Sequence, residues 1–218
     1  MISFSTDADI LKYEPILFAE LHLPGQVLAT GTNGQLSGTA FTDSSADFAA
    51  AQVSAGGVIH LQSADGLLDG SYEIVAVDSA TQLTVSVVRA NSDDEPVAPP
   101  AASEITYRIG TFAPQAIQVA YQLTEYFGIK PGNPASSIEV QAILNTDVLK
   151  RASVFGVISH LYAMLASKAD EENCWKKILY YQKLFEKARQ RCRLSIDTGQ
   201  DGVADVVKDG SSARLMRD

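Results

Sequence analysis

The spacing of apolar residues changes twice along this chain, and this change limits its fold more than any other sequence feature. From about residue 27 to residue 110, β-branched and aromatic residues alternate with polar ones, which is typical of strands with one buried face. On both sides of this segment, apolar residues recur at spacings of three and four, the period of an amphipathic helix. The sequence therefore predicts an α+β fold.

The stretch GSYEIVAVDSATQLTVS, residues 70–86, shows the alternation most clearly. It predicts two strands joined by a turn at residues 78–81, because Asp and Ser favour turns. Asn33-Gly34 predicts a further hairpin turn, since Asn-Gly is a strong two-residue hairpin signal. With the similar runs VLATGTNG, GVIHLQ and EITYRIG, the middle of the chain is predicted to form a small antiparallel barrel or sandwich.

The predicted helices begin and end at recognisable signals. Ser5-Thr6-Asp7 is an N-cap signal ahead of the first apolar run, and Pro15 predicts a break between two short helices. Ser136 with Glu139 fits a capping box and predicts a short helix that reaches Leu144. Two longer helices follow. The last of them carries an apolar stripe made of Cys174, Ile178, Tyr181, Phe185, Ala188 and Cys192.

These patterns divide the chain into three predicted parts. Residues 1–26 and 111–196 form a bundle of four to five helices, residues 27–110 form an inserted β-domain, and residues 197–218 form an extended, flexible C-terminal tail. Pro24-Gly25 and Gly110 mark the edges of the insertion. Insertions are tolerated where the chain leaves and re-enters a surface at nearby points.

The net charge of −9 is unevenly distributed. Residues 1–110 carry three Lys and Arg against fourteen Asp and Glu, a net charge of −11, whereas residues 111–218 carry fourteen against twelve, a net charge of +2. The acidic first half is unsuited to holding nucleic acid, because affinity for phosphate comes from Lys and Arg. It is expected to be a solvated surface or one that repels DNA.

Catalytic and cofactor-binding motifs are not found in the sequence. His22, His60 and His160 lack Cys, His or Asp neighbours at metal-ligand spacing. The glycines of residues 31–38 fit neither a nucleophile elbow nor a phosphate-binding fingerprint. Asp93-Asp94-Glu95 is expected to be a solvated loop, because no apolar pocket surrounds it. We therefore expect a protein that is not an enzyme and carries no cofactor.

Cysteine usage and hydropathy favour a cytosolic folding environment. Cys174 and Cys192 are eighteen residues apart on one predicted helix, which separates them by roughly 27 Å, too far for a disulfide. The apolar stretch 154–166 is shorter than a membrane helix, and the acidic start of the chain lacks the basic region of a signal peptide. No membrane association is expected.

Residues 197–205, DTGQDGVAD, are a weak candidate for a metal site. Asp197, Asp201 and Asp205 stand at the first, fifth and ninth positions of a calcium-loop pattern, with Gly at the sixth. The third position is neither acidic nor Asn, and Lys208 stands at the twelfth position, where a bidentate Glu is needed. No metal is therefore expected, and the segment is interpreted as a polar linker.

The last predicted helix is basic, and its positive side chains are candidates for contacts between subunits. A solvated face, contact with an acidic neighbouring subunit and contact with DNA are the alternatives. Tyr180 and Tyr181 are expected to lean towards the apolar stripe, so that no aromatic residue is expected among the basic ones. The candidate contact residues are Lys176, Lys177, Lys183, Lys187 and Arg189.

The helical segments resemble the head–tail connector, or adaptor, proteins of tailed bacteriophages. The resemblance rests on TDADILKYEPIL, on ILNTDVLKRASVFGVISHLYAML and on ENCWKKILYYQKLFEKARQRCRLSIDTGQDG, and it covers residues 1–26 and 111–200. AFTDSSADFAAAQVSAGGVIHLQ and GSYEIVAVDSATQLTVS are similar to small β-modules of phage structural proteins. The large β-segment is a departure from the smallest members of the family, which are little more than the bundle.

This resemblance implies a structural protein of the virion neck that is assembled in the bacterial cytoplasm. It implies a homomeric ring, expected to be a dodecamer, that joins the portal protein to a downstream neck or tail-terminator protein and lets DNA pass without sequence-specific binding. Such a ring needs an interface at which one face of a subunit meets a different face of its neighbour. The alternative is a ligand- or calcium-binding accessory module of the particle, or another tail or neck protein.

The resemblance also gives the C-terminal tail a role in docking to the portal or to a neighbouring subunit. A polar tail with few apolar residues is expected to order only when it binds a partner. The candidate docking residues are Val206, Val207, Arg214, Leu215, Met216 and Arg217.

Overall fold

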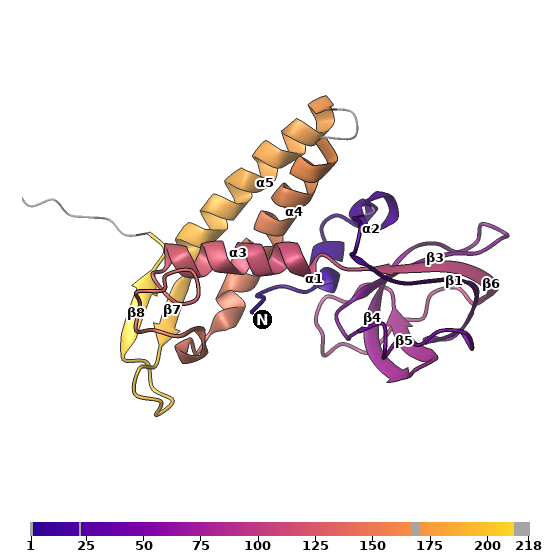
Figure 1. Cartoon of the computed structure of the whole chain (residues 1–218), viewed down its shortest axis with the longest axis horizontal. Helices are drawn as coiled ribbons and strands as arrows, with labels where there is room; N and C mark the ends of the chain where they lie inside the picture. Colours follow the sequence, from indigo (N-terminus) through magenta and orange to yellow (C-terminus); the bar gives the residue numbers. More distant parts are fainter. Residues whose placement is uncertain (1, 22, 167–170, 212–218) are drawn as a thin grey trace, which may run out of the picture. The chain divides into compact units, whose positions relative to one another are not determined.

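The computed structural model describes residues 2–21, 23–166 and 171–211, and the chain divides into two compact units (Figure 1). The barrel unit consists of Thr6–Phe112, and the helical unit consists of Met1–Ser5 and Ala113–Asp218. The predicted α+β class is confirmed. The described residues contain five α-helices and a closed, six-stranded antiparallel barrel.

The barrel closes because each of its six strands pairs with two neighbours. The strand order around the barrel is β1-β2-β5-β4-β3-β6, and every pairing is antiparallel. Closure satisfies the backbone groups of each strand on both sides. The strands are β1 (Val27–Ser37), β2 (Ala40–Thr42), β3 (Val58–Gln62), β4 (Asp69–Ser79), β5 (Gln82–Ser86) and β6 (Ala102–Gly110).

Side chains from alternate strand positions fill the barrel, as the period of two predicts, and residues of the connections between strands, such as Phe48 and Leu68, complete its core. Phe41, Phe48 and Tyr107 pack together with ring centroids between 5.0 and 6.2 Å apart. The Tyr107 hydroxyl donates a 2.8 Å hydrogen bond to the buried Asp43 carboxylate. This buried charged group therefore has a hydrogen-bond partner. The apolar residues around these rings include Leu36, Ile59, Leu61, Leu68, Ile74, Leu83, Val85, Ile105 and Ile109.

One of the two predicted hairpin turns is confirmed and the other is wrong. β4 ends at Ser79 and β5 begins at Gln82, so the chain turns inside residues 78–81. In contrast, β1 runs straight through Asn33-Gly34 with shifts of register against β6. A β-carbon at Gly34 would lie 2.7 Å from the Phe41 ring. Packing of this ring against the glycine overrides the local preference of Asn-Gly for a turn.

Two short helices, α1 (Asp7–Leu11) and α2 (Ile16–Glu20), belong to the barrel unit. Thr6 caps α1 through a capping box with Asp9, as the N-cap signal predicts. The Arg108 guanidinium on β6 donates two 2.8 Å hydrogen bonds to backbone oxygens at the end of α2. Arg108 thus attaches α2 to the barrel by donating to carbonyl groups near the C-terminal end of this helix, where a positive charge is favourable.

The boundaries of the units differ from the predicted domains. Residues 1–26 were expected with the later helices, but residues 6–26 group with the barrel. Asp7 contributes to this grouping, because its carboxylate accepts a 2.8 Å hydrogen bond from the backbone N–H of Phe112 at the other end of the barrel unit. A bundle interrupted by an inserted barrel therefore stays a proposal.

Three long helices build the helical unit: α3 (Ala113–Tyr126), α4 (Lys150–Ala166) and α5 (Glu171–Arg191). α4 is central and packs against both of the others (Figure 1). A β-carbon at Gly156 of α4 would lie 2.8 Å from a methyl group of Val119 on α3 and 3.2 Å from the Phe185 ring on α5. The absence of a side chain at Gly156 therefore allows the three helices to approach closely.

The stretch Thr146–Ala166, which includes α4, is long and apolar enough to cross a membrane when judged by length and composition alone. Within its most apolar window, 61% is buried inside the protein. Because a buried core helix passes the same test, the stretch is weak evidence for a membrane segment.

The connection between α3 and α4 does not contain the predicted helix up to Leu144. It holds two 3₁₀ turns, Val140–Ala142 and Thr146–Leu149. Ile143 lies between them and forms a β-bridge with Ile196. This pairing holds the chain in an extended conformation, so the α-helix that the capping-box pattern predicts does not form.

A hairpin of β7 (Arg193–Ile196) and β8 (Val206–Asp209) follows α5. The Lys208 ammonium donates hydrogen bonds of 2.7 and 3.2 Å to the carbonyls of Phe127 and Gly128, and this contact caps the C-terminal end of α3. The prediction of an extended tail is therefore wrong for residues 197–211. Residues 212–218 lie outside the described residues.

Candidate functional site

α5 has two faces of opposite character. Ile178 and Tyr181 are buried in the helical unit, whereas Trp175, Leu179 and Tyr180 are 55%, 62% and 58% exposed. Residues four apart lie above one another on a helix, so Lys183 extends the row of Trp175 and Leu179. We name this surface the outward face of α5. It consists of Trp175, Lys176, Leu179, Tyr180, Lys183 and Lys187, and the exposed acids Glu172 and Glu186 lie on the same side of the helix.

The five basic residues predicted for subunit contact do not share one environment. Lys176, Lys183 and Lys187 lie on the outward face and are exposed. The Lys177 ammonium lies 5.2 Å from the centroid of the Tyr162 ring. The Arg189 guanidinium lies 4.0 Å from the centroid of the Tyr126 ring, and its buried Nε has no hydrogen-bond partner. Lys177 and Arg189 therefore contribute to cation–π packing within the helical unit.

Aromatic residues lie among the basic ones, contrary to prediction. Tyr181 does lie in the buried stripe and stacks on Tyr162 with ring centroids 6.2 Å apart, but Tyr180 projects outward. Sequence reasoning also missed Trp175 and Leu179. The helical period contains this signal, because the outward residues lie opposite the stripe of residues 178, 181 and 185.

The loop between β7 and β8 contains the three weak calcium candidates. Asp197 accepts hydrogen bonds from the backbone N–H groups of Asp201 (3.4 Å) and Gly202 (2.7 Å). One oxygen of Asp205 accepts from the Thr198 hydroxyl and from the N–H groups of Thr198 and Gly199, at 2.8–2.9 Å. These bonds, with the hydroxyl foremost, lower the pKa of Asp205. The carboxylates therefore hold the loop in shape.

A metal cluster is not found in the described ranges 2–21, 23–166 and 171–211, since no three His, Cys, Asp or Glu side chains there are arranged to hold an ion. His160 lies on α4, where burial lowers its pKa. Both cysteines are free thiols. Burial raises the pKa of Cys192, whose Sγ donates to the Val148 carbonyl at 3.1 Å, so this thiol stays protonated and unreactive. His22 lies outside the described residues.

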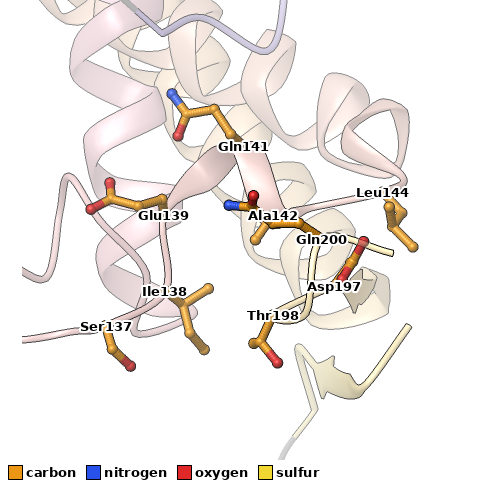
Figure 2. A pocket seen from close by; sticks show the side chains of 9 residues that line it. All are labelled: Ser137, Ile138, Glu139, Gln141, Ala142, Leu144, Asp197, Thr198 and Gln200. Atoms are coloured by element: carbon orange, nitrogen blue, oxygen red, sulfur yellow. The ribbon is translucent and has the colours of Figure 1, made fainter. Parts of the chain in front are cut away.

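An open groove of about 780 Å³ lies beside the β7–β8 loop (Figure 2). One wall is the α3–α4 connection and the other is the segment after β7. Backbone hydrogen bonds of 2.9 and 2.8 Å join the two walls, from Leu144 N–H to the Ser195 carbonyl and from Asp197 N–H to the Ala142 carbonyl. The lining residues are Ser137, Ile138, Glu139, Gln141, Ala142, Leu144, Asp197, Thr198 and Gln200.

Hydroxyl, amide and carboxylate groups line both walls of the groove, whereas its apolar side chains come from the α3–α4 connection alone (Figure 2). Its Glu139 carboxylate pairs with Lys130 at 3.0 Å. Lys and Arg are not among the described residues that line it. This composition fits a short extended peptide better than a phosphate, which needs positive charge or several backbone N–H groups.

His60, Ser71 and Asp69 form a polar cluster on the barrel that their spacing in the sequence does not reveal. They come together because β3 pairs with β4 in a register that places His60 opposite Ser71. The His60 Nδ1 lies 3.1 Å from the Ser71 hydroxyl, and its Nε2 lies 3.6 Å from the Asp69 carboxylate. The second distance exceeds a hydrogen bond, so the cluster lacks the carboxylate–imidazole bond of a catalytic triad.

The acidic loop at residues 93–95 is exposed, as predicted, and Arg89 anchors it. The Arg89 guanidinium forms a buried ion pair with Glu73 at 2.8 Å. It also donates 2.7 Å hydrogen bonds to the carbonyls of Ser92 and Asp94. Arg89 therefore fixes the loop to the barrel. A lysine could not replace it, because the planar guanidinium carries five N–H donors and an ammonium group has three.

The predicted docking residues of the tail fall into two groups. Val206 and Val207 lie on β8 and are 37% and 45% exposed. The other members lie outside the described residues; they are Arg214, Leu215, Met216 and Arg217.

Comparisons of the chain with protein-family models, with curated proteins and with solved structures returned no significant match.

Proposed function

We propose that this protein is a head–tail adaptor of a tailed bacteriophage, a structural protein and not an enzyme. It forms a homomeric ring, a dodecamer, that joins the portal to a downstream neck or tail-terminator protein. DNA passes through the ring without sequence-specific contacts. The ring belongs to the neck of the virion and assembles in the cytoplasm of the host bacterium.

The outward face of α5 is the observation that carries this proposal. A helix that already buries one face within its own unit keeps Trp175, Leu179 and Tyr180 exposed on the other, beside three lysines. A contiguous apolar patch with a polar rim is typical of a surface that binds another protein. The segment that contains α5 is also one of those that resemble the adaptor family.

The charge distribution supports an interface between different faces of identical subunits. The barrel unit carries the net charge of −11 that the first half of the sequence has, while α5 has six Lys and Arg against three Glu. Opposite charges on two faces of one chain attract when copies meet head to tail. A head-to-tail contact of this kind closes into a ring when its rotation divides a full circle.

Reconstitution with the portal protein of the same phage tests the proposal. The full chain is mixed with assembled portal, and the product is measured by native mass spectrometry and cryo-electron microscopy. We expect a ring of this chain on one end of the portal. An absence of portal binding, together with absence of the chain from purified virions, would contradict the proposal.

Calcium binding is the alternative that the three carboxylates of the β7–β8 loop suggest. A β-carbon at Gly199 would lie 3.6 Å from an Asp205 oxygen, 3.8 Å from an Asp197 oxygen and 4.0 Å from Cγ of Asp201. Because backbone N–H groups already occupy Asp197 and Asp205, we expect millimolar calcium to leave the melting temperature unchanged. Differential scanning calorimetry with calcium and with EDTA measures this. Asp205→Asn should lower the melting temperature by the same amount with calcium as with EDTA, because it weakens the hydrogen bonds that hold the loop.

A further inference from the structure

We propose that the loop between β3 and β4 of one copy, together with the first residue of β4 (residues 63–69 in all), docks on the outward face of α5 of a second copy. The inference rests on the proposed ring and names the two surfaces that meet in it. It follows from the shape, the exposed apolar side chains and the charges of these two surfaces, taken separately in the barrel unit and in the helical unit.

The β3–β4 loop presents one leucine to solvent. Leu67 is 78% exposed, the largest exposed fraction among the large apolar side chains of the described residues, whereas the adjacent Leu68 is fully buried in the barrel. Covering an exposed leucine at the tip of a loop favours binding, because apolar surface is removed from water. Leu67 is therefore the apolar anchor of the barrel unit.

Hydrogen bonds within the loop fix the position of Leu67. The Asp65 carboxylate accepts from the Ser63 hydroxyl at 2.5 Å and from the Leu67 N–H at 3.1 Å. The Ser63 hydroxyl oxygen in turn accepts from the Leu68 N–H at 3.0 Å, and Gly66 has the positive φ that the turn requires. A loop that is already ordered loses little conformational entropy when it binds.

Negative charge surrounds the leucine. Asp65 and Asp69 flank it, and the side chain of Asp69 is 58% exposed. The Ser63 hydroxyl, followed by the Leu67 N–H, lowers the pKa of Asp65, so Asp65 is ionised at neutral pH. The loop is thus an apolar tip between two carboxylates.

The outward face of α5 is the counterpart of this tip. Trp175, Leu179 and Tyr180 offer apolar surface. Lys183 places an ammonium group beside it, as does Lys176, whose ammonium also pairs with Glu172 at 2.8 Å. Aromatic residues at the centre of a patch are the usual anchors of an interface. Leu67 meets apolar side chains and the two carboxylates meet lysines, so both parts of the contact are complementary.

The acidic loop at residues 93–95 fits this face less well. Arg89 binds two of its carbonyls and adds positive charge to it. Its neighbouring apolar side chain, Val97, is smaller than leucine and 58% exposed. Val97 therefore supplies a matched control on the same unit.

Assembly on the portal measures the effect of substitutions at both surfaces. Leu67→Asp and Leu179→Asp should each weaken ring formation about tenfold or more, because each places a charge at an apolar contact. Val97→Asp and Lys150→Glu, at exposed positions outside the two surfaces, should leave assembly unchanged. Circular dichroism and melting temperature confirm that each variant folds, which we expect because all four side chains are exposed.

Charge reversal identifies the pairing directly. Asp69→Lys and Lys183→Glu should each reduce assembly, and the double variant should recover most of it, since the reversed charges attract again. If the Leu67→Asp and Leu179→Asp variants both assembled as well as the wild-type chain, the inference would be overturned. The proposed ring would still stand. Failure of the wild-type chain to form any ring on the portal would instead overturn the proposed function and this inference together.

Cysteine cross-linking distinguishes contact between copies from contact within one. A Leu67→Cys chain and a Leu179→Cys chain are mixed on the portal and oxidised, with the unsubstituted chain as the background for Cys174 and Cys192. A covalent dimer of the two chains supports the inference. A disulfide that forms only within a single chain carrying both substitutions would overturn it.

Discussion

At the scale of single residues, Asp7 joins the start of the barrel unit to its end. Its carboxylate is almost fully buried and accepts a hydrogen bond from Phe112 N–H. Burial raises the pKa of Asp7 to about 6, and the hydrogen bonds that oppose this shift, from Phe112 and Thr111, only partly offset it. The ionised form is therefore costly in the folded state, although the hydrogen bond itself is useful.

Asp7→Asn should stabilise the barrel unit at neutral pH. Between about pH 4 and pH 6 the folded protein keeps a proton on Asp7 that the unfolded chain has lost, so this group lowers the free energy of unfolding as the pH rises. Because asparagine keeps an oxygen that accepts from Phe112 N–H, we expect a gain of up to about 3 kcal/mol above pH 7 and little change near pH 4. Urea unfolding followed by circular dichroism at both pH values measures the difference.

Asp93→Asn is the control for this pH dependence, because Asp93 lies in the exposed acidic loop. It should leave the free energy of unfolding nearly unchanged at both pH values. A stabilisation by Asp7→Asn that is equal at pH 4 and pH 8 would contradict the assignment of the effect to the buried charge.

At the scale of elements, the packing of α4 between α3 and α5 depends on a position without a side chain. α4 buries residues on nearly all sides, including Ser153 and Ser159, so it lacks the single apolar stripe of a surface helix. Ser153 contributes a 2.8 Å hydroxyl–hydroxyl hydrogen bond with Ser5. At Gly156 side chains of both α3 and α5 lie against the α4 backbone, so a side chain introduced there would contact both neighbouring helices.

Gly156→Ala should destabilise the helical unit by about 1–3 kcal/mol, because overpacking exceeds the gain of about 1 kcal/mol in helix propensity. Thermal unfolding with Trp175 fluorescence, the signal of the single tryptophan, measures the loss. Val119→Ala removes the methyl group that lies 2.8 Å from the new β-carbon. The double variant should therefore lose less than the two single losses added together, whereas a stabilising Gly156→Ala would contradict the close packing.

Some elements follow from local sequence and others do not. Thr6 and Pro15 predict the first two helices because caps and helix breaks act within a few residues. Asn33-Gly34 fails because the Phe41 ring, brought there by another strand, decides the conformation. The β7–β8 hairpin was missed because each strand has four residues, too few for a period to emerge, and nine residues separate them.

The candidate surface could be predicted in part. The apolar stripe of residues 174–192 predicts which side of α5 is buried, and the lysines on the other side follow from the helical period. The exposure of Tyr180 could not be predicted from the burial of its neighbour Tyr181, because consecutive residues project in directions about 100° apart around the helix axis. The turn that exposes Leu67 depends on the burial of Leu68 in the barrel. A pattern in a single sequence does not predict such a tertiary contact.

At the scale of the whole molecule, the chain combines two units that each have their own core. The barrel unit contributes most of the negative charge, and the helical unit contributes the apolar and basic face of α5. The sequence indicates this division through its change of period and its charge asymmetry. It does not indicate that residues 6–26 group with the barrel, because short helices carry no signal for the partner on which they pack.

Closure of the barrel also has a consequence for a protein held at high local concentration. Sheet edges are templates on which another chain can add a strand and start aggregation, and a closed barrel presents none. Among the described residues, β8 pairs with β7 alone, so it keeps one such edge, with Val206 and Val207 exposed along it. If copies of this protein misassociate by strand addition during refolding, β8 is where we expect fibril-like pairing to begin.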